Sequence, residues 1–210
     1  MRYADRADAG RRLAKLLDAY RHGPPARVLG LARGGVAVAA PIARALGRPL
    51  DVLVIRKLGL PWAPEVAFGA IGPYGVDVRA ADAADRLSPA EAEGVAARAR
   101  AEVDRRVRLY RGERPPLTLT GEVALIVDDG LATGATAHAA VALAREMAAS
   151  RVVVAVPVGS PQAVAGLERA ADEVVCPEAP AWFDAVSRYY REFDQVTDDE
   201  VVELLAAAWA

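Results

Sequence analysis

Two adjacent carboxylates followed by a run of small residues mark the place in this sequence where chemistry is most expected. Asp128 and Asp129 come directly after an apolar run, and residues 130–136 (GLATGAT) follow them. Carboxylates accept hydrogen bonds from hydroxyl groups, and glycines let backbone amides approach a ligand closely. Thr133 and Thr136 add hydroxyl donors, and a helix that begins in this run would direct its positive end toward the same point. The segment therefore predicts a cradle for one phosphate beside two acids suited to a diol, as in a sugar phosphate.

The same residues could form a strand, an Asp-Asp-Gly turn and a threonine-capped helix without any ligand. Burying two adjacent acids at the end of a strand costs free energy unless polar groups contact their carboxylates, and this favours the presence of a ligand. A nucleotide-binding P-loop is excluded because no Gly-Lys-Ser/Thr follows, and the Gly-x-Gly-x-x-Gly spacing of dinucleotide-binding loops is absent. The segment thus points to a sugar phosphate rather than to a nucleotide loop of either common kind.

Short apolar strands alternate with helices along the chain. The pattern predicts strands over 26–31, 50–55, 65–71, 76–79, 122–127, 151–158 and 173–176, and helices over 8–20, 36–46, 88–110, 134–149, 162–170 and 198–209. Strands that lack polar alternation indicate an α/β protein whose mainly parallel, twisted sheet is covered by helices on both faces. Ligands in such sheets bind beyond the carboxyl ends of the strands, which selects the loops after residues 31, 55 and 127.

Composition excludes several classes of protein. The net charge of −2 and the pI of about 5.8 argue against non-specific nucleic-acid binding, which needs surplus Lys and Arg. No apolar run approaches the ~18–20 residues that cross a bilayer, and the first ten residues lack the apolar core of a secretory signal. We therefore expect a cytoplasmic protein that binds neither nucleic acid nor membrane. Asparagine is absent and only two of the 26 basic residues are lysine; this predicts a thermostable protein, although a GC-rich genome would produce the same bias.

Residues 123–136, VALIVDDGLATGAT, closely resemble the signature of the type I phosphoribosyltransferases: an apolar strand, two acids, and a short loop ending in Thr-Gly-x-Thr. The resemblance implies that Asp128 and Asp129 hold the ribose hydroxyls of 5-phosphoribosyl-1-pyrophosphate (PRPP). It also implies that the loop and the start of the next helix bind the 5-phosphate, through Gly130, Ala132, Thr133, Gly134, Ala135 and Thr136.

The likeness extends over nearly the whole chain. Residues 31–35 (LARGG) resemble the family's pyrophosphate loop, which implies that Arg33, Gly34 and Gly35 bind the pyrophosphate, although Arg33 could be a solvated charge before a turn. Lys57, one of only two lysines, would place a compact charge beside a phosphate, although chance also explains it; Arg56 is a weaker candidate. Residues 54–59 and 64–70, with both ends of the chain, resemble a subgroup of predicted phosphoribosyltransferases whose acceptor is unassigned.

The resemblance implies a reaction in which a nitrogen nucleophile displaces pyrophosphate from C1 of PRPP through a transition state like an oxocarbenium ion. Magnesium would bind mainly through oxygens of PRPP and pyrophosphate, so no residue is assigned as a direct metal ligand. The segment 57–64, expected to be a loop, is a candidate lid. Purine-salvage members often carry an acid at the position of Ala132 to exchange a proton with the base, and alanine cannot do this. We therefore do not expect a 6-oxopurine salvage enzyme of that kind, and the acceptor is either already deprotonated or exchanges its proton with another residue.

One phosphoribosyltransferase domain is expected to span residues 1–210. A small hood would come from approximately 1–22 and 177–210, with a helical insertion over approximately 88–111. Aromatic residues gather in the second hood segment, where they favour a core or an interface over a base-stacking platform, and they make a homodimer possible: Trp182, Phe183, Tyr189, Tyr190 and Phe193.

Three functions remain open at this stage. A transferase that makes a nucleotide is the first. The second is a PRPP-binding regulatory protein without transferase activity, which should carry a basic face or a nucleic-acid module, and neither is evident in the sequence. The third is a sugar-phosphate hydrolase or binding protein, which would break down PRPP without an acceptor. The sequence does not identify the acceptor.

Overall fold

A five-stranded parallel sheet forms the centre of the molecule in the computed structural model, which describes residues 2–80 and 87–210. The strands lie in the order β2-β1-β6-β7-β8, and every neighbouring pair is parallel. Their bounds are β1 Ala26–Leu31, β2 Leu50–Leu53, β6 Val123–Val127, β7 Arg151–Ala155 and β8 Glu173–Val175. The mainly parallel α/β sheet expected from the alternation of strands and helices is confirmed.

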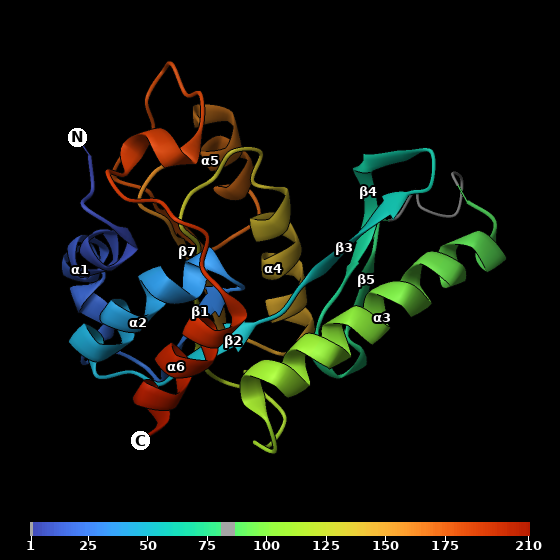
Figure 1. Cartoon of the computed structure of the whole chain (residues 1–210), viewed down its shortest axis with the longest axis horizontal. Coiled ribbons are helices and arrows are strands. Elements are labelled where there is room, and N and C mark those ends of the chain that lie inside the picture. The colour runs from blue at the N-terminus through green and yellow to red at the C-terminus, as the bar shows by residue number, and fades with distance from the viewer. Residues whose placement is uncertain (1, 81–86) are drawn as a thin grey trace.

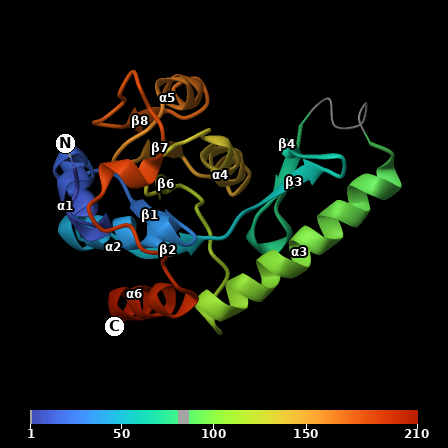
Figure 2. The ribbon, with the colours of Figure 1, turned by 45° about the horizontal axis from the view of Figure 1, so that its top comes forward.

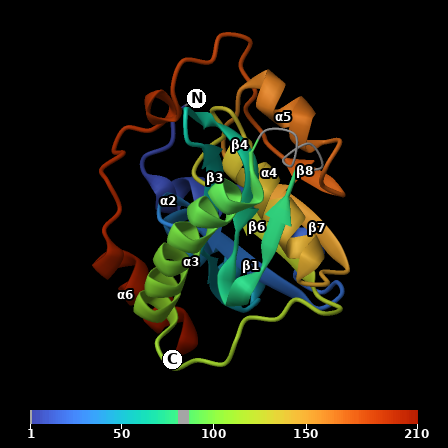
Figure 3. The same cartoon turned by 90° about the vertical axis from the view of Figure 1, so that its right-hand side faces the viewer.

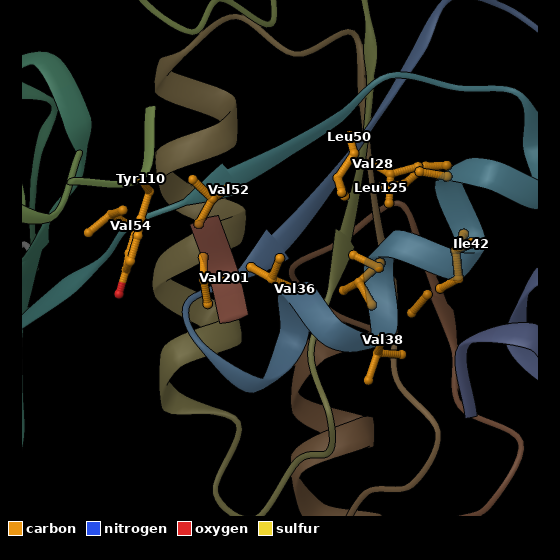
Figure 4. Packing of buried hydrophobic residues seen from close by; sticks show 14 of the residues in the cluster. Val28, Val36, Val38, Ile42, Leu50, Val52, Val54, Tyr110, Leu125 and Val201 are labelled. Atoms are coloured by element: carbon orange, nitrogen blue, oxygen red, sulfur yellow. The ribbon is translucent and has the colours of Figure 1, made fainter. Parts of the chain in front are cut away.

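Helices cover both faces of this sheet (Figures 1 and 2). One face carries α1 (Arg6–Leu16), α2 (Gly34–Leu46) and α6 (Asp198–Trp209), and the other carries α4 (Ala135–Glu146) and α5 (Pro161–Leu167). Successive strand residues point to opposite faces. Accordingly, Val28 packs in the cluster under α1, α2 and α6, part of which is shown in Figure 4, while its neighbour Leu29 packs under α4 and α5. Because helices bury both faces of the sheet, the strands consist of continuous runs of apolar residues.

A second, smaller unit extends from one side of the sheet (Figures 1 and 3). It contains the antiparallel strands β3 (Arg56–Leu60), β4 (Ala63–Ile71) and β5 (Asp77–Arg79), with the long helix α3 (Pro89–Arg111) packed against them. The expectation of a loop over 57–64 was wrong, because residues 57–60 belong to β3, residues 63 and 64 begin β4, and residues 61 and 62 form the turn of a β-hairpin. Leu58 and Leu60 alternate toward the interior and pair with β4, and these tertiary contacts outweigh the glycine and prolines that predicted a loop.

A buried ion pair joins α3 to the main sheet. The guanidinium of Arg111 contacts the carboxylate of Asp51 in β2 at 2.8 Å (Nε to Oδ1) and 3.1 Å (Nη2 to Oδ2), and both side chains are almost fully buried. Arg111 also donates to the carbonyl of Pro115 and to the hydroxyl of Tyr74. The hydroxyl of Tyr110 donates to Asp198 at the start of α6. These contacts fix the C-terminal end of α3 in place.

Most helix ends follow the expected capping chemistry. Ser88 and Thr197 both form the reciprocal capping box with the glutamate three residues later, and Gly47 ends α2 in the left-handed conformation. The first helix is shorter than expected, because it ends at Leu16 and a 3-10 turn, Asp18–Tyr20, follows. Two further 3-10 turns span Pro73–Gly75 and Val186–Tyr189. Within residues 2–80 and 87–210, no helix is long and apolar enough to span a bilayer.

Candidate functional site

The sheet topology brings two of the three selected loops together. From β1 the chain crosses to β2 on one side, whereas from β6 it crosses to β7 on the other side. The carboxyl ends of β1 and β6, which are adjacent strands, are therefore the point where the sheet changes direction, and ligands bind at such points. The loop that begins at Ala32 and the loop that begins at Asp128 consequently meet.

A hollow of about 180 Å³ opens in the second of these loops. It is lined by Asp128, by most of the small-residue run and by one residue from the C-terminal segment: Gly130, Leu131, Ala132, Thr133, Gly134, Ala135, Thr136, Ala137 and Val186. The phosphate-loop residues expected from the sequence thus surround one cavity together with one of the two acids. A Cβ at Gly130 would come within 2.6 Å of Val186, so a larger residue would collide with the wall of this cavity.

The amino end of α4 forms part of the same wall. Gly134 is the N-cap and has φ of 73°, a left-handed conformation that glycine adopts without strain, and it has no side chain to cap the helix. The amide of Ala135 donates a long hydrogen bond of 3.4 Å to Oγ1 of Thr133, and the other amides of the first turn have no intrahelical acceptor. The helix end is therefore suited to bind an anion that enters the hollow.

The two acids have different surroundings. Asp128 lines the hollow, and its Oδ1 accepts a hydrogen bond from the amide of Asp129 at 2.9 Å. The Asp129 carboxylate contacts Nε of Arg6 at 2.8 Å instead, and its backbone carbonyl accepts the hydroxyl of Tyr190 at 2.6 Å. The acids expected to act as a pair are thus adjacent, but only Asp128 lies in the wall of the hollow.

Both acids are harder to ionise than an ordinary aspartate. Burial, followed by the neighbouring charge of Asp129, raises the pKa of Asp128 to about 8. Burial also raises the pKa of Asp129, but the hydrogen bond and the charge of Arg6 oppose this rise. Two carboxyl groups this close do not both ionise readily, so the proton that they retain resides mainly on Asp128.

Gly34 and Gly35, at the start of α2, pack directly against the acidic loop. A Cβ on Gly34 would lie 2.1 Å from Oδ2 of Asp129, and one on Gly35 would lie 2.4 Å from the carbonyl oxygen of Val127. The peptide bond between Ala32 and Arg33 is cis. The sequence suggested that these glycines let amides approach a phosphate; in the structure they also let the two loops touch.

A larger hollow of about 620 Å³ lies between the small sheet, α3 and the acidic loop. Its wall includes Lys57 and Arg56, and Thr136 borders both hollows. The other residues of the wall are Ala32, Ile55, Gly59, Leu60, Pro61, Pro64, Val95, Arg98, Ala99 and Glu102. Lys57 is therefore brought to the same region as the phosphate loop, as expected. Arg33 lines neither hollow; its Nη1 lies 3.8 Å from Oδ1 of Asp198.

The larger hollow has a surplus of positive charge. Within the described part of the chain, Arg56, Lys57 and Arg98 form no ion pair. Among the described residues of the wall the acid is Glu102, which is shared by two arginines on the same helix, at 2.9 Å and 2.6 Å. A cavity lined in this way attracts an anion.

The aromatic residues of the C-terminal segment divide into two groups. Tyr190 packs with Tyr3 and Phe193 in a small core between the two ends of the chain. Phe183 stacks on Tyr189 at 5.8 Å between ring centroids, whereas Trp182 is 93% exposed. Trp182 and Phe183 line a further hollow of about 340 Å³ near Ser160. The first group forms core, whereas in the second Phe183 and Tyr189 are half-buried and Trp182 is exposed.

Sequence reasoning missed the roles of Arg6, Arg98 and Val186. A signal for Arg6 exists, because a cation in the first turn of a helix faces the positive end of the helix dipole and needs a compensating partner. No comparable signal marks Arg98 among the arginines of α3. Val186 reaches Gly130 only through the path of the C-terminal segment.

The fold and the site together define a class of protein: an α/β protein with a cavity of small and acidic residues at the switch point of a parallel sheet. Residues 3–193 match the model of the phosphoribosyl transferase domain, so this chain belongs to the phosphoribosyl transferase family. The family and the enzyme class, phosphoribosyltransferase, agree with the resemblance seen in the sequence.

Relatives support this membership over the whole chain. The chain is 43% identical to the protein TT1426 of Thermus thermophilus, whose crystal structure superposes with a TM-score of 0.91 over 99% of each chain. It is also 50% identical, over 98% of its length, to a protein provisionally named a phosphoribosyl transferase in two strains of Mycobacterium tuberculosis. The match covers 47% of that protein, so the chain spans about half the length of these curated relatives.

Proposed function

We propose that this chain transfers the 5-phosphoribosyl group of PRPP to a nitrogenous acceptor and releases pyrophosphate. One observation carries the proposal: Asp128, the small-residue loop and the uncapped amino end of α4 line one hollow at the switch point of the sheet. An anion site beside a carboxylate matches the two halves of a ribose phosphate. Membership in the phosphoribosyl transferase family supports the same assignment.

The 5-phosphate would lie against the amides of residues 132–136, as the resemblance implies. The ribose hydroxyls would bind Asp128 and the oxygen of Asp129 that does not contact Arg6. Negative charge beside the ribose would stabilise the positive charge that develops on the ring in the transition state.

The pyrophosphate of PRPP would extend into the larger hollow, which Thr136 connects with the phosphate site. Lys57 would contact it there, and Arg33, Gly34 and Gly35 would approach it from the start of α2. Arg56 and Arg98 supply further positive charge in the same wall. Within the described part of the chain no cluster of three or more His, Cys, Asp or Glu could hold a metal. This suits magnesium bound through PRPP oxygens and water, where it would offset the charge of the leaving pyrophosphate.

The acceptor would enter beside C1 of the ribose. Residues of approximately 1–22 and 177–210 would form the hood over it, and the exposed Trp182 and half-buried Phe183 would contact it. The unit that contains α3 would border the pyrophosphate. Ala132 lies in the wall of the phosphate hollow and carries no group that could exchange a proton, so the acceptor would bind already deprotonated.

Calorimetry with PRPP and magnesium tests donor binding. The unmodified protein should bind PRPP tightly, and Asp128→Asn/Asp129→Asn should bind it at least about tenfold more weakly, since hydrogen bonds to charged groups contribute about 1.5–3 kcal/mol each. Asp18→Asn is a matched control, because Asp18 is exposed, pairs with exposed Arg21 and lies outside the hollows of the proposed site. Equal binding by all three proteins would refute the site.

Pyrophosphate release distinguishes a transferase from the alternatives. Release that depends on an added nitrogenous base indicates transfer, and release without a base indicates a hydrolase. Tight PRPP binding without release for any base in a broad panel would favour the PRPP-binding regulatory protein. The same panel identifies the acceptor.

A further inference from the structure

Resting on the proposed function, we infer that Arg6 is a positioning residue that keeps the carboxylate of Asp129 charged and turned toward the ribose site. Arg6 lies at the first position of α1, far in sequence from the acidic loop. None of the sequence motifs assigns it a role. It acts through Asp129 and is not placed to touch the reacting atoms.

The guanidinium of Arg6 is held on several sides. Nε contacts Oδ2 of Asp129 at 2.8 Å, and Nη1 donates to the backbone carbonyl of Asp194 at 2.7 Å. The ring of Phe193 lies 3.8 Å from the guanidinium carbon, which is a cation–π distance. The Arg6 side chain is only 12% exposed. With these contacts the side chain has little freedom to leave Asp129, so it restrains the carboxylate.

The location of Arg6 in α1 is otherwise unfavourable. A positive charge in the first turn of a helix faces the positive end of the helix dipole, which is unfavourable. The preceding residue, Asp5, caps α1 through its own side chain, so Arg6 has no part in the cap. An attractive contact that offsets this unfavourable interaction explains why an arginine is present here, and the carboxylate of Asp129 provides that contact.

The charges around Asp129 come from four elements. Asp128 is a second titratable carboxyl, which holds its proton more readily and precedes Asp129 in the same loop, and α2 presents the backbone of Gly34. From the C-terminal segment, Tyr190 donates its hydroxyl to the backbone carbonyl of Asp129. Arg6 is the positive group in contact with the carboxylate among the residues that the structure describes. Without Arg6, the two adjacent acids would compete for one proton on nearly equal terms.

Arg6 therefore divides the roles of the two acids. Asp129 remains the charged member and presents Oδ1 to a ribose hydroxyl, whereas Asp128 retains the proton more readily. The same contact ties the acidic loop to both ends of the chain. The amide of Tyr3 donates to the carbonyl of Tyr189 at 2.8 Å, and the amide of Arg191 donates to the carbonyl of Tyr3 at 2.9 Å.

The test compares Arg6→Ala, Arg6→Lys and the control Arg11→Ala. Arg11 lies on the same helix, but it is 61% exposed and reaches Asp8 only at 3.9 Å. PRPP affinity with magnesium is measured by calorimetry from about pH 6 to about pH 9, a range that includes the raised pKa of Asp128. We expect Arg6→Ala to weaken binding about tenfold or more at about pH 7, Arg6→Lys to weaken it less, and Arg11→Ala to match the unmodified protein.

The pH dependence identifies the mechanism. Loss of Arg6 raises the pKa of Asp129, so a smaller fraction of Asp129 is charged at neutral pH and the deficit should shrink as the pH rises. A deficit that is constant with pH would show a merely structural role and overturn the inference, as would unchanged affinity at every pH. If Arg6→Ala does not fold, the same pH series is measured with Arg6→Lys, and a PRPP-binding deficit that does not shrink as the pH rises overturns the inference.

A second measurement does not depend on PRPP. Carboxyl carbon chemical shifts, followed by NMR during titration, should show a higher pKa for Asp129 in Arg6→Ala and no change in Arg11→Ala. An unchanged Asp129 titration would overturn the inference. A raised pKa together with no PRPP binding by the unmodified protein would leave the role of Arg6 intact and refute the proposed function instead.

Discussion

The backbone of Gly34 lies so close to the carboxylate of Asp129 that a Cβ at position 34 would come within 2.1 Å of Oδ2. The two residues belong to different loops, which follow adjacent strands of the sheet. The loop proposed for the pyrophosphate therefore supports the loop proposed for the ribose. A change in one is expected to disturb the ligand of the other.

Gly34→Ala is the direct test of this contact. The added methyl group must displace Asp129 or the start of α2, so we expect a loss of about 1–3 kcal/mol of stability and at least about tenfold weaker PRPP binding. Denaturant unfolding and calorimetry measure the two effects.

Gly94→Ala is the matched control, because nothing lies within 4 Å of a Cβ at this position inside α3. Alanine in place of a helical glycine should stabilise the protein by up to about 1 kcal/mol and leave PRPP binding unchanged. If Gly34→Ala behaves like this control, the two loops do not depend on each other.

Asp128→Asn should stabilise the protein, and the gain should depend on pH. Burial raises the pKa of Asp128 to about 8, so ionisation in the folded state is unfavourable. The folded protein holds a proton that the unfolded chain releases above its ordinary pKa of about 3.9, so stability falls as the pH rises from about 4 to about 8. Asparagine removes this penalty. We expect a Tm increase of about 2–4 °C or more at about pH 8, corresponding to at least about 1 kcal/mol.

The gain from Asp128→Asn should diminish toward about pH 5, where the carboxyl is already neutral. Thermal unfolding at several pH values measures this trend, and PRPP affinity measured on the same samples should decrease. A Tm gain that is equal at all pH values would contradict the burial of an ionisable Asp128.

Lys57→Ala and Arg98→Ala test the larger hollow. Both side chains line it without an ion partner in the described part of the chain. If the pyrophosphate lies there, each variant should bind PRPP about tenfold more weakly, while ribose 5-phosphate, which has no pyrophosphate, should bind unchanged. Calorimetry with the two ligands separates the sites. Arg108→Ala is the control on α3, because Arg108 does not line the hollow; equal losses for both ligands would place these cations elsewhere.

Arg111→Ala should be among the most destabilising single substitutions outside the apolar core. It would leave the carboxylate of Asp51 buried without its partner, which costs about 3–5 kcal/mol. Arg105→Ala removes an exposed ion pair on the same helix and should cost less than about 1 kcal/mol. Unfolding in urea measures both. Similar values for the two variants would show that the Asp51–Arg111 pair does not hold α3 to the sheet.

Hypoxanthine and guanine should not be turned over. The residue in the loop that would exchange a proton with such a base is Ala132, which lines the phosphate hollow but has no ionisable group. A pyrophosphate-release assay with PRPP, magnesium and each base checks this expectation. Steady turnover of either base would require another proton donor near the acceptor.

Local patterns in the sequence predicted most of the main body. The apolar runs of β1, β6 and β7 have no polar alternation, and burial on both faces by helices requires that pattern. Ser88 and Thr197 signalled helix starts because capping depends on residues three positions apart. The hairpin of β3 and β4 was missed, because Gly59, Pro61 and Pro64 suggested a loop and only pairing with β4 shows otherwise.

The sequence by itself determined the parallel α/β architecture and the position of the acidic, small-residue loop at a strand end, since periodicity and turn chemistry act between near neighbours in the chain. Only the tertiary structure decided that Arg6 contacts Asp129, that Gly34 packs on the same carboxylate, and that Arg98 faces the hollow with Lys57. These partners lie tens of residues or more apart. Their contacts depend on the order of the strands and on how α1 and α3 pack, which no local pattern encodes.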